Sequence, residues 1–142
     1  MKFFLLILLL PVFALCQEIP KKSTTIVVRN IGLLEASQKL VDMGYMIDKK
    51  DPELGTVYTT PYAYSGSYQM MIYVRVKDST ATITGKWNVN ADIKLGYSTY
   101  DMRTWNPIKY SSMSGNMDRK AFMIMDKYAK SFGKSIEYLV VK

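Results

Sequence analysis

Residues 68–89 read YQMMIYVRVKDSTATITGKWNV, and this stretch predicts the centre of the fold. Apolar and polar side chains alternate along both of its halves, as they do in a β-strand with one buried side and one solvent-facing side. Asp78 and Ser79 stand between the halves and are typical turn residues. We therefore predict an antiparallel hairpin, whose buried face consists of Tyr68, Met70, Ile72, Val74, Val76, Ala81, Ile83, Gly85, Trp87 and Val89.

The opposite face of this hairpin carries positive charge. It includes Tyr73, Arg75, Lys77, Thr82, Thr84 and Lys86. Basic side chains on a sheet can simply keep it solvated and discourage pairing with other chains. They can also attract an anionic partner. Both interpretations remain open, and the second makes Tyr73, Arg75, Lys77 and Lys86 candidate partner-binding residues.

The sequence on either side of the hairpin predicts two helices. Apolar residues recur at helical spacing in residues 32–43 and 117–132. Each segment is followed by a glycine, Gly44 or Gly133, which can end a helix in the left-handed conformation. The two helices can bury their apolar sides together by packing on one face of a sheet.

Shorter segments predict the remaining strands. β-branched or alternating residues occur at 24–29, 45–47, 56–60 and 136–140. The order β-α-β-β-β-β-α, with a short last strand, predicts an α+β fold: an antiparallel sheet of four to six strands with two helices on one face. Residues 24–142 then form one domain after an extended lead-in over residues 17–23. Residues 98–115 are rich in Ser, Thr, Asn and Gly and are expected to form a long loop.

The first sixteen residues, MKFFLLILLLPVFALC, have the pattern of a secretory signal peptide. Small residues, Ala14 and Cys16, precede Gln17 at the spacing that signal peptidase requires, so we expect cleavage between Cys16 and Gln17. The apolar run is shorter than the roughly 20 residues of a membrane-spanning helix, and no transmembrane segment is expected. The alternative is a lipoprotein anchored through Cys16, but the bulky Leu15 favours simple cleavage. The predicted location is periplasmic or secreted.

The composition excludes much familiar enzyme chemistry. The 142 residues include no histidine and one cysteine, Cys16, which leaves with the predicted signal peptide. Ser-His-Asp and Cys-His mechanisms, the usual zinc and haem sites, and disulfides all need these residues. We therefore expect a non-enzymatic protein without a metal or cofactor.

The charge balance indicates the class of partner. Nineteen Lys and Arg residues oppose twelve Asp and Glu residues, which gives a formal net charge of +7. An exported protein without an RNA-recognition signature is a poor candidate for nucleic acid. We expect an envelope protein, or an anionic lipid or polysaccharide, as the partner.

Tyrosines supply a second group of candidate contacts. The chain has eleven of them, and aromatic rings with polar tips are common at interfaces. Tyr62 and Tyr64 are expected to be exposed at a loop tip, because such a tip has little core to enter. Tyr97 and Tyr100 belong to the region around the predicted long loop.

Three segments together resemble a loose group of known domains. They are LVDMGY at residues 40–45, DPELGTV at residues 51–57, and the two alternating strands of the hairpin. The chain resembles small secreted bacterial domains of unknown function with a TATA-binding-protein-like fold, and the helix-grip domains of BamC, a lipoprotein of the outer-membrane assembly machinery. The resemblance implies a fold and an envelope location, and it implies no catalytic residue.

Two functional hypotheses follow. The first is a non-enzymatic binding or accessory module of the bacterial envelope, which engages its partner through the open sheet face and the tyrosine-rich loops. The second is a carrier that holds a small apolar ligand between the second helix and the sheet, with Phe122, Met125 and Phe132 lining the pocket. The oligomeric state and the identity of the partner stay open.

Overall fold

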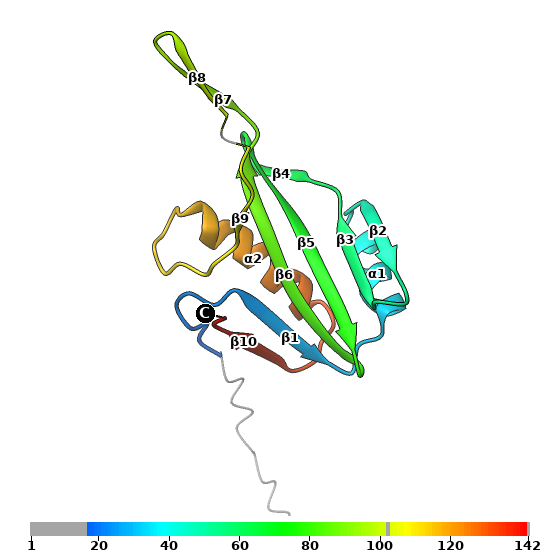
Figure 1. Ribbon diagram of the computed structural model, residues 1–142. Coiled ribbons are helices and arrows are strands. Elements are labelled where there is room, and N and C mark those ends of the chain that lie inside the picture. Colours follow the sequence, from blue (N-terminus) through cyan, green and yellow to red (C-terminus); the bar gives the residue numbers. More distant parts are fainter. Residues whose placement is uncertain (1–16, 102, 142) are drawn as a thin grey trace, which may run out of the picture.

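The computed structural model describes residues 17–101 and 103–141, so the predicted signal peptide lies outside the described residues (Figure 1). The predicted α+β class is confirmed: two helices lie against one face of an antiparallel sheet. The elements in chain order are β1 (Thr25–Arg29), α1 (Leu33–Asp42), β2 (Ile47–Asp51), β3 (Thr56–Thr59), β4 (Tyr62–Ser65), β5 (Tyr68–Lys77), β6 (Thr80–Val89), β7 (Asp92–Leu95), β8 (Ser98–Asp101), β9 (Asn106–Pro107), α2 (Met117–Lys130) and β10 (Ile136–Leu139).

The sheet is larger than the predicted four to six strands. Within the described residues it has eight, in the order β10-β1-β6-β5-β3-β2, with β4 also paired to β5 and β9 also paired to β6. The difference arises because β4 and β9 are too short to show a hydrophobic period. Both become strands only through pairing with the long central hairpin.

The β5–β6 hairpin is present with the predicted faces. Tyr73 pairs with Thr84, and Val74 pairs with Ile83. Ile72, Val74 and Ile83 are fully buried beneath the helices, whereas Arg75, Lys77 and Lys86 are exposed on the other side. One-sided burial of this kind fixes the register, because a slip by one residue would turn every core side chain to solvent.

The first and last strands of the domain are neighbours. β1 lies between β6 and β10 and is antiparallel to both, with Ile26 opposite Ile83 on one side and Tyr138 on the other. Ile26 and Val28 are fully buried under α2. Strand β1 therefore closes the core only after distant parts of the chain have come together.

Helix α2 begins at the predicted residue, Met117, and ends at Lys130, two residues before the predicted end. The side chain of Asn116 accepts a hydrogen bond from the backbone N–H of Arg119 at 3.3 Å, which satisfies one of the free donors at the helix start. Lys127 and Lys130 lie in the last turn, where the helix dipole favours positive charge. Both helices agree with their predicted ranges to within two residues.

Gly85 allows α2 to approach the sheet closely. A Cβ atom at this position would lie 2.6 Å from Ile108 Cδ1, 2.8 Å from Met125 Sδ and 2.9 Å from the Met71 carbonyl oxygen. These contacts are closer than side chains tolerate. Glycine is thus required here by packing and not by backbone conformation.

Residues 98–115 were predicted to form one long loop, and this prediction is wrong. β8 and β9 lie within this range, and β8 pairs with β7 to form a two-stranded arm outside the main sheet (Figure 1). Gly96 makes the turn of the arm with φ +63°, a conformation that favours glycine. Of the helices in the described part of the chain, none has the length and apolar character needed to cross a membrane.

Candidate functional site

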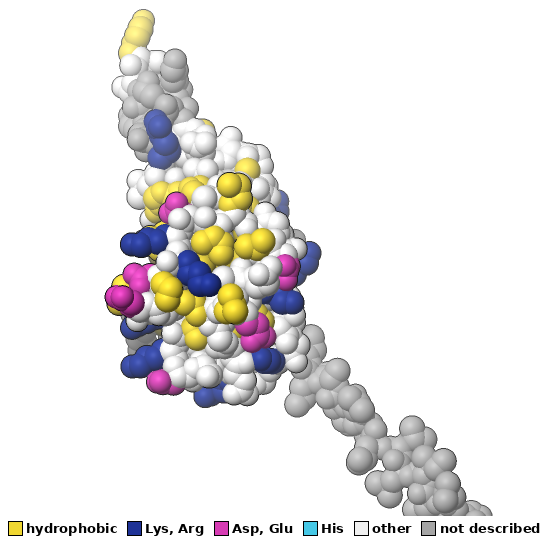
Figure 2. Space-filling model, turned by 90° about the vertical axis from the view of Figure 1, so that its right-hand side faces the viewer, with side chains coloured by type: hydrophobic (Ala, Val, Ile, Leu, Met, Phe, Trp, Pro, Cys, Tyr) yellow, Lys and Arg dark blue, Asp and Glu magenta, His cyan; other side chains and the backbone are white. Residues whose placement is uncertain are grey.

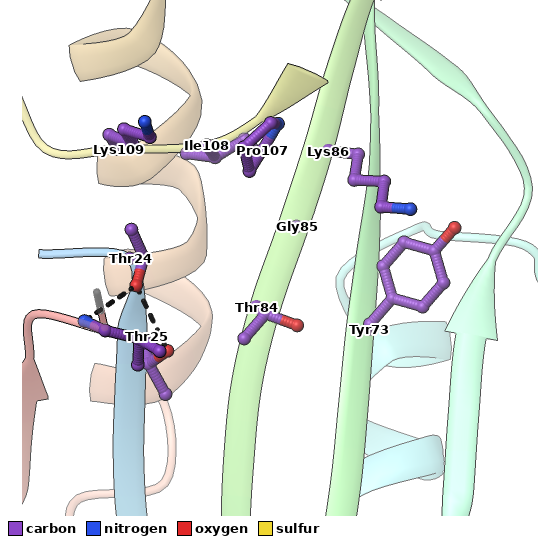
Figure 3. A pocket seen from close by; sticks show the side chains of 10 residues that line it. Thr24, Thr25, Tyr73, Thr84, Gly85, Lys86, Pro107, Ile108 and Lys109 are labelled. Carbon is purple, nitrogen blue, oxygen red and sulfur yellow. Dashed lines mark hydrogen bonds between the residues drawn. The ribbon is translucent and has the colours of Figure 1, made fainter. Parts of the chain in front are cut away.

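A groove crosses the sheet on the face opposite the helices, which we call the open face (Figure 3). Its volume is about 570 Å³, within the range of small-molecule sites. We call it the Tyr73–Lys86 groove. Its lining consists of Thr24, Thr25, Tyr73, Thr84, Gly85, Lys86, Pro107, Ile108, Lys109 and Val141.

The groove exists because two strands share one edge of β6. β1 pairs with this edge as far as Ile83, and β9 pairs with it from Lys86 onward. Thr84 and Gly85 lie between these two ladders and form the floor. The backbone N–H of Ile108 donates to the Gly85 carbonyl at 3.0 Å, which fixes the segment after β9 above the floor.

Three distant segments form the wall on the β1 side. The backbone N–H of Tyr110 donates to the Ser23 carbonyl at 2.7 Å, and the N–H of Val141 donates to Thr24 Oγ1 at 3.4 Å. The predicted extended lead-in over residues 17–23 is therefore wrong in part. It turns at Lys22, where φ is +66°, and Ser23 is fully buried because the segment packs beside Tyr110.

Tyr73 and Lys86 form the opposite wall. Lys86 Nζ lies 5.8 Å from the centroid of the Tyr73 ring, a cation–π distance, and the Tyr73 ring packs on Tyr58 with centroids 5.4 Å apart. Partial burial, with smaller contributions from Tyr58 and Asp48, raises the pKa of the Tyr73 hydroxyl. The phenol therefore stays protonated at neutral pH and keeps a hydrogen-bond donor.

The polar groups of this wall and of the floor are available to a ligand. Among the residues that the structure describes, none forms a hydrogen bond or an ion pair with Tyr73 Oη, Thr84 Oγ1 or Lys86 Nζ. Figure 3 shows the Thr84 hydroxyl and the Lys86 side chain on the side of Tyr73. The three groups can therefore act on one ligand without breaking a hydrogen bond or an ion pair, although Lys86 Nζ also has its cation–π contact with the Tyr73 ring.

Positive charge continues along the same face. Arg75 lies two residues after Tyr73 and Lys77 two residues further, so all three side chains leave β5 on the open side. Arg75 and Lys77 also line a smaller hollow of about 320 Å³ beside the β2–β3 turn, which contains Glu53. Among the described residues that line the Tyr73–Lys86 groove there is no carboxylate, and the two charged ones, Lys86 and Lys109, are basic.

Tyr62 and Tyr64 do not belong to this face, and the predicted exposure of both is wrong. They lie on β4, which pairs with β5 and covers the helix side of the core. Tyr62 packs on Tyr45 with ring centroids 4.7 Å apart, and the Tyr64 hydroxyl donates to the Met117 carbonyl at 3.4 Å. Burial raises the pKa of Tyr62 above its usual range and that of Tyr64 to about 12. The segment is a short strand and not a free tip.

Tyr97 and Tyr100 lie on the β7–β8 arm, which extends beyond one end of the β5–β6 hairpin (Figure 1). Tyr97 is fully exposed next to the turn of the arm. Tyr100 pairs with Ile93 through its backbone. The candidate residues of the sequence therefore divide into an open-face group, a half-buried pair on the helix side and an arm.

Sequence reasoning missed half of the groove. Thr84 was placed on the correct face by its alternation with Ile83. The residues of the opposite wall, Thr24, Thr25, Pro107, Lys109 and Val141, come from segments without a usable period. Only the pairing of β1 and β9 with the same edge of β6 brings them to this place.

The proposed carrier pocket is occupied by side chains at its centre. Phe122 and Met125 are fully buried, and Met125 Sδ packs against Gly85 as described above. Phe132 is half-buried and packs edge-on against Tyr128, with ring centroids 5.1 Å apart. This arrangement favours a filled core over a ligand cavity at these three residues.

Neither a metal centre nor a known family offers a further indication of function. In the part of the chain that the structure describes, no three His, Cys, Asp or Glu side chains come together as a metal site. Comparison of the chain with models of protein families and with curated proteins finds no match.

Proposed function

We propose that this protein is a non-enzymatic binding module of the bacterial cell envelope, and that its open sheet face holds an anionic partner. One observation carries the proposal. Tyr73 Oη, Thr84 Oγ1 and Lys86 Nζ share a groove of about 570 Å³, and none of the lining residues that the structure describes carries a carboxylate. Donors without a hydrogen-bond partner among the described residues are suited to an acceptor-rich, negatively charged ligand.

The surrounding charge supports the same class of partner. Arg75 and Lys77 extend the basic surface of the groove along β5. Exposed charges of one sign raise the local concentration of oppositely charged partners and increase the rate of association. Because the rings of Tyr62 and Tyr64 lie on the helix side, the proposal rests on the groove and not on a tyrosine-rich tip.

The envelope location is proposed from the sequence. Residues 1–16 have the pattern of a signal peptide, with Ala14 and Cys16 before Gln17. We propose that the exported protein begins at Gln17 and acts in the periplasm or outside the cell. The fold-level resemblance to secreted bacterial domains and to BamC agrees with this location.

The test compares two double variants that remove the same amount of positive charge. R75E/K86E changes the open face, and K120E/K127E changes exposed positions on α2, on the other side of the sheet. Co-sedimentation with envelopes from the source cell, measured over a range of salt concentrations, gives the affinity and its salt dependence. We expect R75E/K86E to weaken binding and to reduce its salt dependence, because screened attraction is being removed.

The two variants separate a located site from general attraction to a basic protein. If K120E/K127E weakens binding as much as R75E/K86E does, charge alone explains the affinity, and the open face is not the site. If neither variant changes binding while both remain folded, the β7–β8 arm around Tyr97 becomes the surface to examine.

A further inference from the structure

We propose that the ligand of the Tyr73–Lys86 groove is an acidic saccharide, a sugar unit that carries a carboxylate or a phosphate. This inference rests on the proposed function and makes it more specific. The acidic group would lie beside Lys86 Nζ, with hydrogen bonds from Thr84 Oγ1 and Tyr73 Oη. The rest of the sugar would lie along β6 between the two walls (Figure 3).

The first argument is the density of hydroxyl groups. Thr24, Thr25, Thr84 and Tyr73 all line the groove, and each hydroxyl can donate and accept a hydrogen bond. A bare anion needs only donors. A ligand with hydroxyl groups of its own needs both, and this lining supplies both beside the basic residues.

The second argument is that these hydroxyls make few hydrogen bonds within the described part of the protein. Thr24 Oγ1 has only long contacts, at 3.4 Å to Thr25 Oγ1 and at 3.4 Å from the N–H of Val141. The hydroxyls of Thr84 and Tyr73 have no hydrogen-bond partner among the described residues. The groove thus offers hydrogen-bonding capacity on its floor and on both walls, which suits a polar ligand of small-molecule size.

The third argument separates a saccharide from a membrane surface. A protein that docks on lipid inserts apolar side chains beside its basic ones. The large apolar side chains that are well exposed in the described chain include Leu34, Val41 and Met46, which lie on or next to α1. Figure 2 shows apolar side chains gathered on the side of the molecule that carries α1. Of these exposed residues in the described chain, Val141 is the one that lines the groove, and Leu139 and Val140 precede it at the C-terminal end.

The fourth argument concerns the arrangement of charge. Lys86 and Lys109 stand on opposite sides of the floor, Lys86 with Tyr73 and Lys109 with Pro107 (Figure 3). Lys109 therefore provides a second basic group across the groove from the first. A ligand with two acidic groups, as in a chain of acidic sugar units, could contact both.

The experiment titrates isotopically labelled protein with defined probes and follows backbone amide shifts by NMR. The acidic probes are glucuronic acid, N-acetylneuraminic acid, glucose 6-phosphate and a galacturonic acid trimer. Glucose, maltotriose and inorganic phosphate test whether the sugar or the acid alone suffices, and phosphatidylglycerol vesicles test for lipid. We expect at least one acidic sugar to shift Thr84, Gly85, Lys86 and Lys109, with maltotriose and glucose inactive.

Three variants test the assignment of the groups. K86Q is expected to reduce the affinity for the active probe by about tenfold or more, because a charge-assisted hydrogen bond is lost. Y73F, which keeps the ring and removes the hydroxyl, should give a smaller loss. K120Q, which changes an exposed lysine on α2, should leave the affinity unchanged.

Three outcomes of the titration would overturn the inference. It is wrong if no acidic sugar produces shifts at the groove, if inorganic phosphate binds as well as glucose 6-phosphate does, or if only the vesicles bind. In those cases the envelope assay with R75E/K86E still tests the broader proposal independently. If that variant loses envelope binding while the sugars fail, the open face is the site and the ligand is of another class.

Discussion

The hydroxyl of Tyr128 on α2 donates a hydrogen bond to the carbonyl oxygen of Ala36 on α1, at 2.8 Å, and both residues are fully buried. This polar contact joins the two helices above the sheet. It places Tyr128, the largest fully buried side chain among the described residues, at their interface. The hydroxyl has no access to water as an alternative partner, so the bond contributes to stability and to the angle between the helices.

Replacing Tyr128 with Phe is expected to lower the free energy of unfolding by about 1 kcal/mol, the typical net value of one hydrogen bond. The ring and its packing against Phe132 remain. Urea unfolding measures the change, and Y97F, at a fully exposed tyrosine, serves as the control. An unchanged midpoint for Y128F would show that the contact does not stabilise the helix pair.

Stability should fall as the pH rises above about 10. Burial raises the pKa of Tyr62, Tyr64 and Tyr128 in the folded protein, that of Tyr64 to about 12, whereas the unfolded chain ionises its tyrosines near 10. Above that pH the unfolded state binds fewer protons than the folded state. The free energy of unfolding therefore decreases as the pH rises further. Below about pH 10 the tyrosines are protonated in both states, and their contribution to stability is fully present.

The pH dependence can be measured by following tyrosinate absorbance and helix content together. We expect some tyrosines to ionise early and the remainder only as the protein unfolds. Y128F should show a weaker loss of stability at high pH than the wild type. Ionisation of all tyrosines in one step near pH 10, with the helices intact, would contradict this prediction.

Gly85→Ala is expected to cost about 1–3 kcal/mol, because the added methyl enters a fully packed contact. In the double variant G85A/I108V, valine lacks the Cδ1 atom of Ile108 that the new methyl group would meet. This variant should therefore recover part of the lost stability. Gly32→Ser is the matched control, since no atom lies within 4 Å of a Cβ there and serine is a good helix N-cap. Equal stability of G85A and the wild type would mean that α2 is not held this close to β6.

Ile72→Ala or Ile83→Ala should lower the free energy of unfolding by about 2–5 kcal/mol, through lost burial and the cavity left behind. Both residues are fully buried on the helix side of the hairpin. Lys77→Ala, on the open face, should change stability by no more than about 0.5 kcal/mol. Losses below about 1 kcal/mol at both isoleucines would show that their assignment to the buried face of the sheet is wrong.

Intact mass analysis of the protein purified from its source cell tests the predicted N-terminus. We expect a chain that begins at Gln17, with the glutamine free or cyclised, and without lipid. A mass that corresponds to a diacylglyceryl group on Cys16 would overturn both the cleavage site and the release from the membrane.

The central hairpin and both helices could be predicted because their hydrophobic periods are long and clear. Alternation over residues 68–89 was enough to place Ile72 and Ile83 inside and Lys86 outside. At the ends of the hairpin the prediction was less accurate. Trp87 is only half-buried, because its indole N–H reaches out to Asp118 at 2.7 Å.

The remaining features depend on contacts between distant segments, which periodicity does not report. β4 carries alternating tyrosines in a Gly- and Ser-rich setting, so the segment resembles a loop until β5 pairs with it. β9 has two residues and contains Pro107, which no strand pattern would suggest. The open-face candidates Tyr73 and Lys86 could be found from the sequence, but the wall across from them could not.

The position of β1 between β6 and β10 determines the order in which this protein can fold as it emerges from a ribosome or a translocon. β1 is made first, yet one of its partners is made near the middle of the chain and the other near the end. Until Ile136–Leu139 are free, Thr25–Arg29 has an unpaired edge of apolar, β-branched residues, which is prone to association with other chains. A chain made in this direction needs protection until its last strand is complete, and a truncation before β10 should therefore aggregate during synthesis.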